Sequence, residues 1–150
     1  MKYYRSVTIH AAHFNESNYP RWYAIRDQIA AEGVVTGENA QQVFNVLNDC
    51  HGHNFTCSVH VEAEQGKDEY SNYIISDEAI VETIMDWHGK NLSIHSDFAG
   101  VRATTETMAE VLCAKIQKRL LVDAKITARI NETPELYAEH TGFYQAPQGE

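Results

Sequence analysis

Histidines are concentrated in two stretches of the chain where polar and apolar residues alternate. His51 and His53 flank Gly52 at the start of one stretch, and His13 ends another. Side chains two residues apart on a strand project from the same face, so His51 and His53 can hold one metal ion together. With His13 supplied by a neighbouring strand, three imidazoles leave one coordination position open. That arrangement is typical of a catalytic zinc site rather than a closed structural one.

A second chemical signal is a carboxylate at the end of an apolar strand face. Apolar and polar residues alternate over residues 124–131, and continuing the alternation places Glu132 on the apolar side. A carboxylate in such a position is costly unless it has a partner. Glu132 is therefore either an edge residue that faces water or a clamp for a planar pair of hydrogen-bond donors.

The elements that would position these residues follow from the hydrophobic periodicity. Strands are predicted over about residues 3–13, 51–62, 124–132 and 136–144, and helices over about 75–87 and 104–120. This order is typical of an α+β fold in which a four-stranded antiparallel sheet carries two helices on one face. Residues 15–49 would form a helical insertion after the first strand. Four strands leave two open edges, which favours oligomerisation through the sheet.

Composition limits the class of protein. With 150 residues, 43% of them hydrophobic, the chain is expected to form a single domain over 1–150. Its net charge of −9 argues against nucleic acid or an anionic membrane surface as a partner. The absence of a signal-like or membrane-spanning run predicts a cytoplasmic protein. Three cysteines without a CxxC motif do not suggest a disulfide framework.

Four motifs occur in order along the chain: AAHF at 11–14, CHGHNF at 50–55, ATTETMA at 103–109 and NET at 131–133. Together they resemble the 6-pyruvoyltetrahydropterin synthase and 6-carboxytetrahydropterin synthase family, whose enzymes have the tunnelling fold. The resemblance implies that His13, His51 and His53 bind Zn²⁺ and that the substrate is a small pterin, 7,8-dihydroneopterin triphosphate. It also implies a homo-oligomer, either a hexamer or a tetramer, with active sites at subunit interfaces.

The resemblance implies roles for further residues. Glu132 would bind the amino-pyrimidinone edge of the pterin and take part in catalysis, while Thr104 and Glu106 would contribute substrate contacts. Family members usually carry the catalytic cysteine a few residues before the HGH motif, whereas here Cys50 directly precedes it. Cys50 is one candidate for the base and Asp49 is another; an inert buried cysteine is the alternative for Cys50.

The family's aspartate–histidine pair is also irregular in this sequence. Its best placement is Asp86 and His88 in the segment DWH, where His88 would relay protons and Asp86 or a nearby acid would orient it. His95, with Asp97 beside it, is the competing choice. A surface histidine is the expected alternative for the one that is not used.

The leading functional interpretation is a zinc-dependent lyase that makes 6-carboxy-5,6,7,8-tetrahydropterin, a step towards queuosine and other 7-deazaguanines. The same motifs are compatible with 6-pyruvoyltetrahydropterin synthase, because both enzymes share the zinc ligands and the pterin clamp. A third interpretation is a pterin- or metal-binding homologue without catalysis, which the displaced cysteine and the irregular aspartate–histidine pair suggest.

Overall fold

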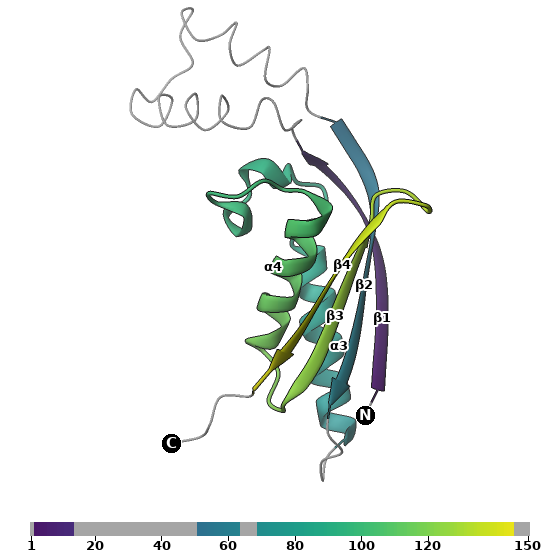
Figure 1. Cartoon of the computed structure of the whole chain (residues 1–150), viewed down its shortest axis with the longest axis vertical. Coiled ribbons are helices and arrows are strands. Elements are labelled where there is room, and N and C mark those ends of the chain that lie inside the picture. Colours follow the sequence, from purple (N-terminus) through teal and green to yellow (C-terminus); the bar gives the residue numbers. More distant parts are fainter. Residues whose placement is uncertain (1, 14–50, 64–68, 146–150) are drawn as a thin grey trace, which may run out of the picture.

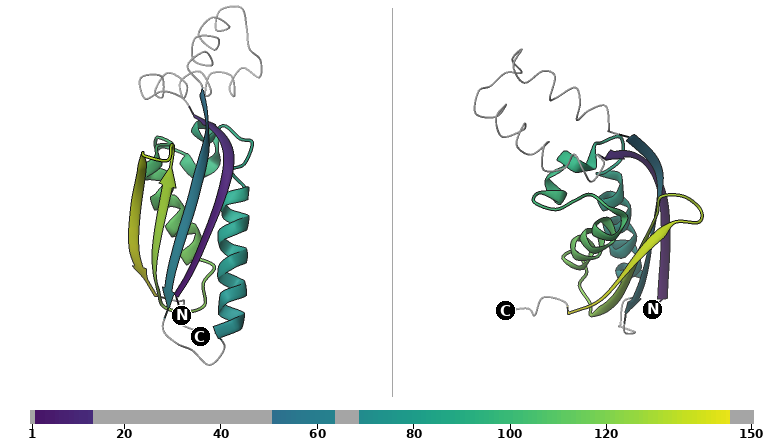
Figure 2. Two further views of the ribbon diagram at one scale, coloured as in Figure 1. Left: turned by 90° about the vertical axis from the view of Figure 1, so that its right-hand side faces the viewer. Right: turned by 45° about the horizontal axis from the view of Figure 1, so that its top comes forward.

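The structure, a computed structural model, describes residues 2–13, 51–63 and 69–145 of the chain. Strands β1 (Lys2–His13) and β2 (His51–Ala63) come first, helices α3 (Glu69–Met85) and α4 (Thr105–Gln117) follow, and strands β3 (Ala124–Asn131) and β4 (Tyr137–Tyr144) come last. The strands form one antiparallel sheet in the order β1-β2-β3-β4. Both helices cover the same face of this sheet (Figure 1; Figure 2). The predicted α+β fold is confirmed.

Some of the predictions concern residues that the structure does not describe. The helical insertion over residues 15–49, together with Cys50 and Asp49, lies outside the described residues. The assignment of the whole chain to one domain likewise stays a prediction.

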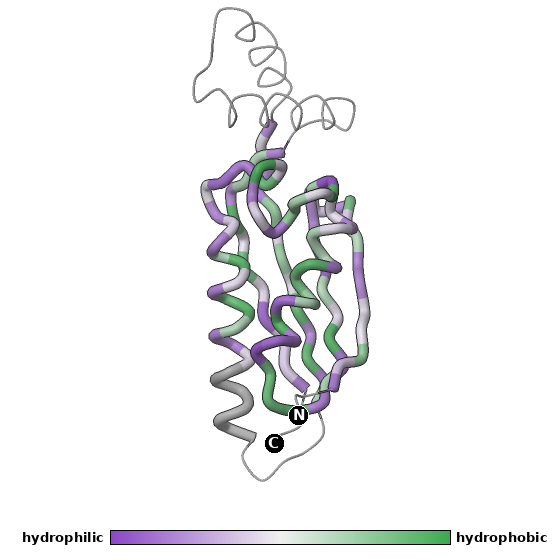
Figure 3. Tube along the Cα trace, turned by 90° about the vertical axis from the view of Figure 1, so that its left-hand side faces the viewer, coloured by the Kyte–Doolittle hydropathy of each residue, from purple (hydrophilic) through white to green (hydrophobic). Residues whose placement is uncertain are grey.

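The core lies between the sheet and the two helices. Alternate residues of β2 and β3 are fully buried against the helices, and hydrophobic segments recur along these elements (Figure 3). An apolar stripe of α4 is buried as well: Met108, Leu112, Ile116 and, just beyond the helix, Leu120. Burying one face of each strand fixes the register of the sheet, because a slip of one residue would turn every apolar side chain outwards.

Helix α3 differs from its prediction at both ends. It begins at Glu69 rather than near residue 75, within a polar segment that has no helix breaker after Gly66. It ends at Met85 rather than Trp87, because the next residues tighten into a turn in which the Trp87 N–H donates to the carbonyl of Ile84. Gly89 then adopts a left-handed conformation, with φ of 73°, which ends the helix.

The chain after this turn covers part of the outer edge of β1. The Gly89 N–H donates to the His10 carbonyl at 2.6 Å, and the Ala12 N–H donates to the Lys90 carbonyl at 3.0 Å. Ala12 and Asn91 form an isolated parallel bridge at the same place. The end of β1 that carries His13 is therefore partly protected from pairing with another strand. The predicted oligomerisation through the sheet edges stays a prediction.

Two short 3-10 helices, η2 (Leu92–Ile94) and η3 (Ser96–Phe98), connect α3 to α4 around a partly buried aspartate. Asp97 accepts hydrogen bonds from Trp87 Nε1 at 2.8 Å and from Lys115 Nζ at 2.6 Å. Burial alone would raise the pKa of Asp97, but the hydrogen bonds from Lys115 and Trp87 outweigh it and leave the pKa below its usual value. The connection is thus tied to both helices.

We expect Asp97→Asn to lose less free energy of unfolding at acid pH than the original chain does. Because the pKa of Asp97 is lowered on folding, its charge stabilises the fold above the unfolded-state value of about 3.9, and this stabilisation is lost as the pH falls through the lower folded value. Urea unfolding between about pH 7 and pH 3 should show the original chain losing more free energy of unfolding below about pH 4 than the variant. Glu110→Gln, at an exposed position of α4, is the control. Curves for Asp97→Asn and the original chain that stay parallel over the whole range would contradict the expectation.

Within the described part of the chain, neither helix is long and apolar enough to cross a membrane.

Candidate metal centre

The three predicted metal ligands meet where β1 ends and β2 begins. The antiparallel register places His13 directly opposite His51 and places Ala11 opposite His53. The Nε2 atoms of His13 and His51 lie 2.8 Å apart, and the ring centroids of His53 are 5.3 Å and 4.9 Å from those of His13 and His51. One nitrogen from each ring and one oxygen of Glu132 all lie within 4.8 Å of one another. Sequence positions that are far apart thus form one compact cluster.

His13 is held in the orientation that a metal ligand needs. Its Nδ1 donates to the carbonyl of Ala103 at 2.9 Å, which leaves the lone pair on Nε2, the atom that faces the cluster. Burial lowers the pKa of His13 below its usual value, and the neighbouring His51 and His53 add to this effect, against the opposing hydrogen bond to Ala103. The ring is therefore neutral at pH 7, as metal binding requires.

His53 provides the clearest test of whether the cluster fits a metal ion. Its Nε2 is buried and lacks a hydrogen-bond partner among the described residues. Oε1 of Glu132 lies only 2.6 Å away, but not in the geometry of a hydrogen bond. A buried polar atom without such a partner is costly. Nitrogen ligands from histidine, with a carboxylate nearby, are the donor set that Zn²⁺ prefers, so these residues fit a zinc ion.

Glu132 lies one residue after β3 rather than within the strand as predicted, and its side chain turns towards the histidines. Its N–H donates to the carbonyl of Leu136 at 3.0 Å in the turn between β3 and β4, which fixes the backbone. Its Oε1 is 2.6 Å from Nε2 of His53 and 3.7 Å from Nε2 of His13. Only 29% of the side chain is exposed, which favours the clamp over an edge residue that faces water.

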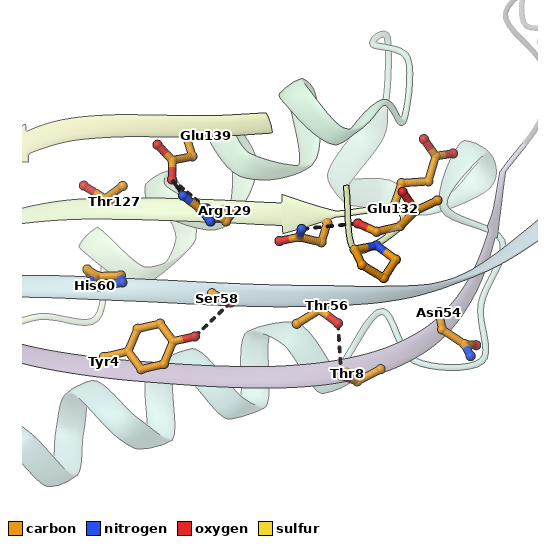
Figure 4. Close-up of a pocket in the computed structure, with 13 residues that line it drawn as sticks. Tyr4, Thr8, Asn54, Thr56, Ser58, His60, Thr127, Arg129, Glu132 and Glu139 are labelled. Carbon is orange, nitrogen blue, oxygen red and sulfur yellow. Dashed lines mark hydrogen bonds and ion pairs between the residues drawn. The ribbon is translucent and has the colours of Figure 1, made fainter. Parts of the chain in front are cut away.

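A groove runs along the helix-free face of the sheet and reaches this carboxylate. It has a volume of about 760 Å³ and is lined mainly by polar side chains. Figure 4 shows Glu132 and Asn54 at one end of the groove, with Tyr4 and His60 towards the other. Arg129 lines it as well, but its guanidinium is paired with Glu139 at 2.6 Å. The groove is large enough for a small-molecule ligand.

The predicted substrate residues Thr104 and Glu106 lie at the start of α4, beside the carbonyl that holds His13. The Thr104 hydroxyl caps the helix by accepting a hydrogen bond from the N–H of Thr107 at 3.3 Å. Hydrogen bonds from its own backbone N–H and from Thr104 hold the pKa of Glu106 below its usual value. Glu106 is therefore an exposed, ionised carboxylate three residues after Ala103, whose carbonyl orients His13. Its contact with a substrate stays a prediction.

The structure does not pair Asp86 with His88. Asp86 instead accepts a hydrogen bond from Nε2 of His95 at 2.9 Å, while Nδ1 of His95 accepts one from the N–H of Asp97. His88 lies in the turn after α3, and its Nδ1 accepts a hydrogen bond from the N–H of His10 at 3.1 Å. The turn directs His88 towards β1, so the aspartate–histidine pair in the described chain is Asp86 with His95. Which histidine relays protons stays a prediction.

Two features near the cluster depend on the backbone and are not predicted from the sequence. The Ala103 carbonyl that orients His13 is a backbone atom, so no residue type reveals it. The approach of residues 89–91 to β1 also depends on the backbone; Gly89, at a left-handed turn, is the one residue that could have indicated it.

The fold of this chain is similar to that of solved 6-pyruvoyl tetrahydropterin synthases. The structure of 6-pyruvoyl tetrahydropterin synthase from Caenorhabditis elegans is similar over 95% of both chains, with a TM-score of 0.60 and 19% identity. The Plasmodium falciparum 6-pyruvoyl tetrahydropterin synthase matches 95% of this chain and 98% of its own, with a TM-score of 0.56 and 15% identity. These similarities show that the chain has the tunnelling fold.

The model of the 6-pyruvoyl tetrahydropterin synthase family matches residues 3–142. The chain therefore belongs to this family, whose members are lyases. No curated protein matches the chain.

Proposed function

We propose that this chain is a zinc-dependent 6-carboxy-5,6,7,8-tetrahydropterin synthase that acts on 7,8-dihydroneopterin triphosphate, a step towards queuosine and other 7-deazaguanines. The observation that carries the proposal is the convergence of three imidazole nitrogens and a carboxylate oxygen within 4.8 Å. Family membership supports a pterin synthase type of reaction. The zinc dependence and the carboxy product are the parts that the proposal adds.

In this proposal each residue of the cluster has a defined task. His13, His51 and His53 would hold Zn²⁺, which as a Lewis acid would polarise the side-chain oxygens of the substrate and acidify the adjacent C–H bonds. Glu132 would accept hydrogen bonds from the N–H donors of the amino-pyrimidinone edge and so orient the pterin ring. Thr104 and Glu106 would contact the substrate from the start of α4.

Moving protons at the acidified carbons requires a base, and the candidates are Cys50 and Asp49. A Plasmodium vivax 6-pyruvoyltetrahydropterin synthase, 13% identical to this chain, is described as a mutant of a catalytic glutamate. This description supports a carboxylate such as Asp49 as the base. The hydrogen bond between Asp86 and His95 supports His95 over His88 as the relay, since a relay histidine needs an orienting partner.

The direct test is to incubate the zinc-loaded protein with 7,8-dihydroneopterin triphosphate and identify the products by mass spectrometry. Carboxytetrahydropterin with acetaldehyde would establish the proposed reaction. The 6-pyruvoyl compound would instead identify a 6-pyruvoyltetrahydropterin synthase. A protein that holds zinc and binds the pterin without turnover would be the non-catalytic homologue, and both reactions would be rejected.

We expect Glu132→Gln to weaken pterin binding while zinc stays bound. The amide keeps the size of the side chain but replaces a charged acceptor, and hydrogen bonds to charged groups contribute about 1.5–3 kcal/mol, or roughly 10- to 100-fold in affinity. Equilibrium binding of 7,8-dihydroneopterin and the zinc content of the same samples would be measured together. Loss of zinc in the variant would show that Glu132 is a metal ligand rather than a pterin clamp. Glu139→Gln, in the same groove, is the control.

A further inference from the structure

A second hollow lies beside the metal centre, where β1 and β2 meet the segment after α3. Its volume is about 770 Å³, and the residues that line it include His53 and Asn54 from β2 and Lys90 and Asn91 from that segment. Part of the lining is made of small residues, Ala12, Gly52 and Gly89. A Cβ atom added at Gly89 would meet nothing within 4 Å, so the space above it is open.

The lining of this hollow suits an anion. It contains the ammonium of Lys90 and the amides of Asn54 and Asn91. Among the described residues that line it, none carries a carboxylate, although the chain has 21 acidic residues. Ammonium and N–H groups are the donors that bind phosphate oxygens, so the lining of this hollow fits a phosphate group.

Two donors of the hollow, the NH₂ group of Asn54 and the ammonium of Lys90, can reach a ligand. His10 Nδ1 is hydrogen-bonded to Oδ1 of Asn54, which turns the NH₂ group of that amide away from His10. Lys90 contacts Asp86 at 2.9 Å, but both side chains are about half exposed. Such surface ion pairs contribute little, so a phosphate can take over the ammonium at low cost.

The hollow and the groove described above meet at Asn54, which lines both. Glu132 lines the groove, and the predicted zinc ligand His53 lines the hollow. Figure 4 shows Asn54 and Glu132 at the same end of the groove. A ligand whose ring edge contacts Glu132 and whose side chain crosses the metal centre would therefore extend its far end towards Lys90.

We propose that this hollow binds the phosphate groups of the substrate through Lys90 and Asn54. The identity of the ligand rests on the proposed function, whereas the preference for phosphate rests on the hollow itself. The proposal also explains how a chain with a net charge of −9 accommodates a triphosphate: the phosphates lie at a place without carboxylates in the lining.

The first experiment uses Lys90→Ala and two ligands that differ only in their phosphates. With the zinc-loaded protein, the KM for 7,8-dihydroneopterin triphosphate should rise about tenfold, as expected for loss of one charge-assisted hydrogen bond. The inhibition constant of 7,8-dihydroneopterin, which lacks phosphates, should change by less than about twofold, because no contact to it is lost. Lys90→Arg should restore the KM. Lys118→Ala, which removes a charge at the far end of α4, is the control.

The second experiment probes the hollow without the pterin. Inorganic triphosphate is titrated into the metal-free protein by calorimetry, and its affinity should fall in Lys90→Ala. It should rise about twofold in Asp86→Asn, because the competing partner of Lys90 is removed. Lys118→Ala should again have no effect.

The outcomes separate the two proposals. Suppose that Lys90→Ala raises the KM for the triphosphate and the inhibition constant of 7,8-dihydroneopterin equally. Lys90 would then only position the segment after α3, and the proposed phosphate site would be overturned. No change in either constant would overturn it as well. If the protein neither turns over the triphosphate nor binds 7,8-dihydroneopterin, the proposed function fails. Binding of inorganic triphosphate that depends on Lys90 would still support the phosphate site, and its absence would reject it.

Discussion

Replacing His53 by alanine is expected to remove both bound zinc and turnover. His53 supplies one of the three imidazole nitrogens of the cluster. Its Nε2 makes no hydrogen bond in the described chain, so it is free to bind the metal ion. Zinc affinity should fall by more than about 100-fold, since the partners that merely orient a ligand are worth roughly 10- to 100-fold. Zinc content after dialysis and competition with a coloured chelator would measure the loss.

The control for this variant lies on the same strand. His60 belongs to β2 but is exposed on the helix-free face, so His60→Ala should keep full zinc binding. Circular dichroism should show both variants folded, because neither side chain belongs to the buried core. Zinc affinity of His53→Ala equal to that of the original chain would falsify the proposed metal centre.

Replacing Trp87 by alanine should lower the free energy of unfolding by about 3–5 kcal/mol, more than any other variant considered above. Trp87 is fully buried, its ring packs on that of Phe98 at a centroid distance of 5.3 Å, and its Nε1 donates to Asp97. The variant loses this packing and leaves a cavity under the connection between α3 and α4. Urea unfolding at neutral pH, with the slope checked for two-state behaviour, would measure the change.

Two further variants show where the loss comes from. Trp87→Phe keeps a ring but removes the N–H, and it should cost about 1–3 kcal/mol because Asp97 loses a donor. Leu121→Ala removes an apolar side chain that is 66% exposed, and it should change stability by less than about 0.5 kcal/mol. A loss below about 1 kcal/mol for Trp87→Ala would mean that the connection does not depend on this side chain.

The parts of the fold and site that the sequence predicts are those governed by periodicity. Alternation along β1, β2 and β3 determines which side chains face the helices, and burial of that face excludes a slip of the register by one residue. Once the register is set, His13 must lie opposite His51, and Glu132 must follow Ile130 on the apolar side. The histidine cluster could therefore be predicted without any knowledge of the loops.

The remaining parts depend on the backbone between α3 and α4, which has no periodic pattern. Asp86 pairs with His95 because the turn at Gly89 directs the chain towards β1 and η2 then brings it back. The spacing of DWH suggests instead that Asp86 acts on His88, its near neighbour. The sequence does not predict the early start of α3 for a related reason: a polar segment without a periodic pattern can still be helical when no residue breaks the helix.

The partner that orients His13 has an evolutionary consequence. In many metal sites a carboxylate side chain accepts the second N–H of the ligating histidine, and one nucleotide change can remove such a partner. Here a main-chain oxygen at position 103 does this, and every amino acid has one. Substitutions at position 103 can change packing but leave the acceptor in place. Descendants of this chain can therefore vary at that position while the ring of His13 keeps its tautomer.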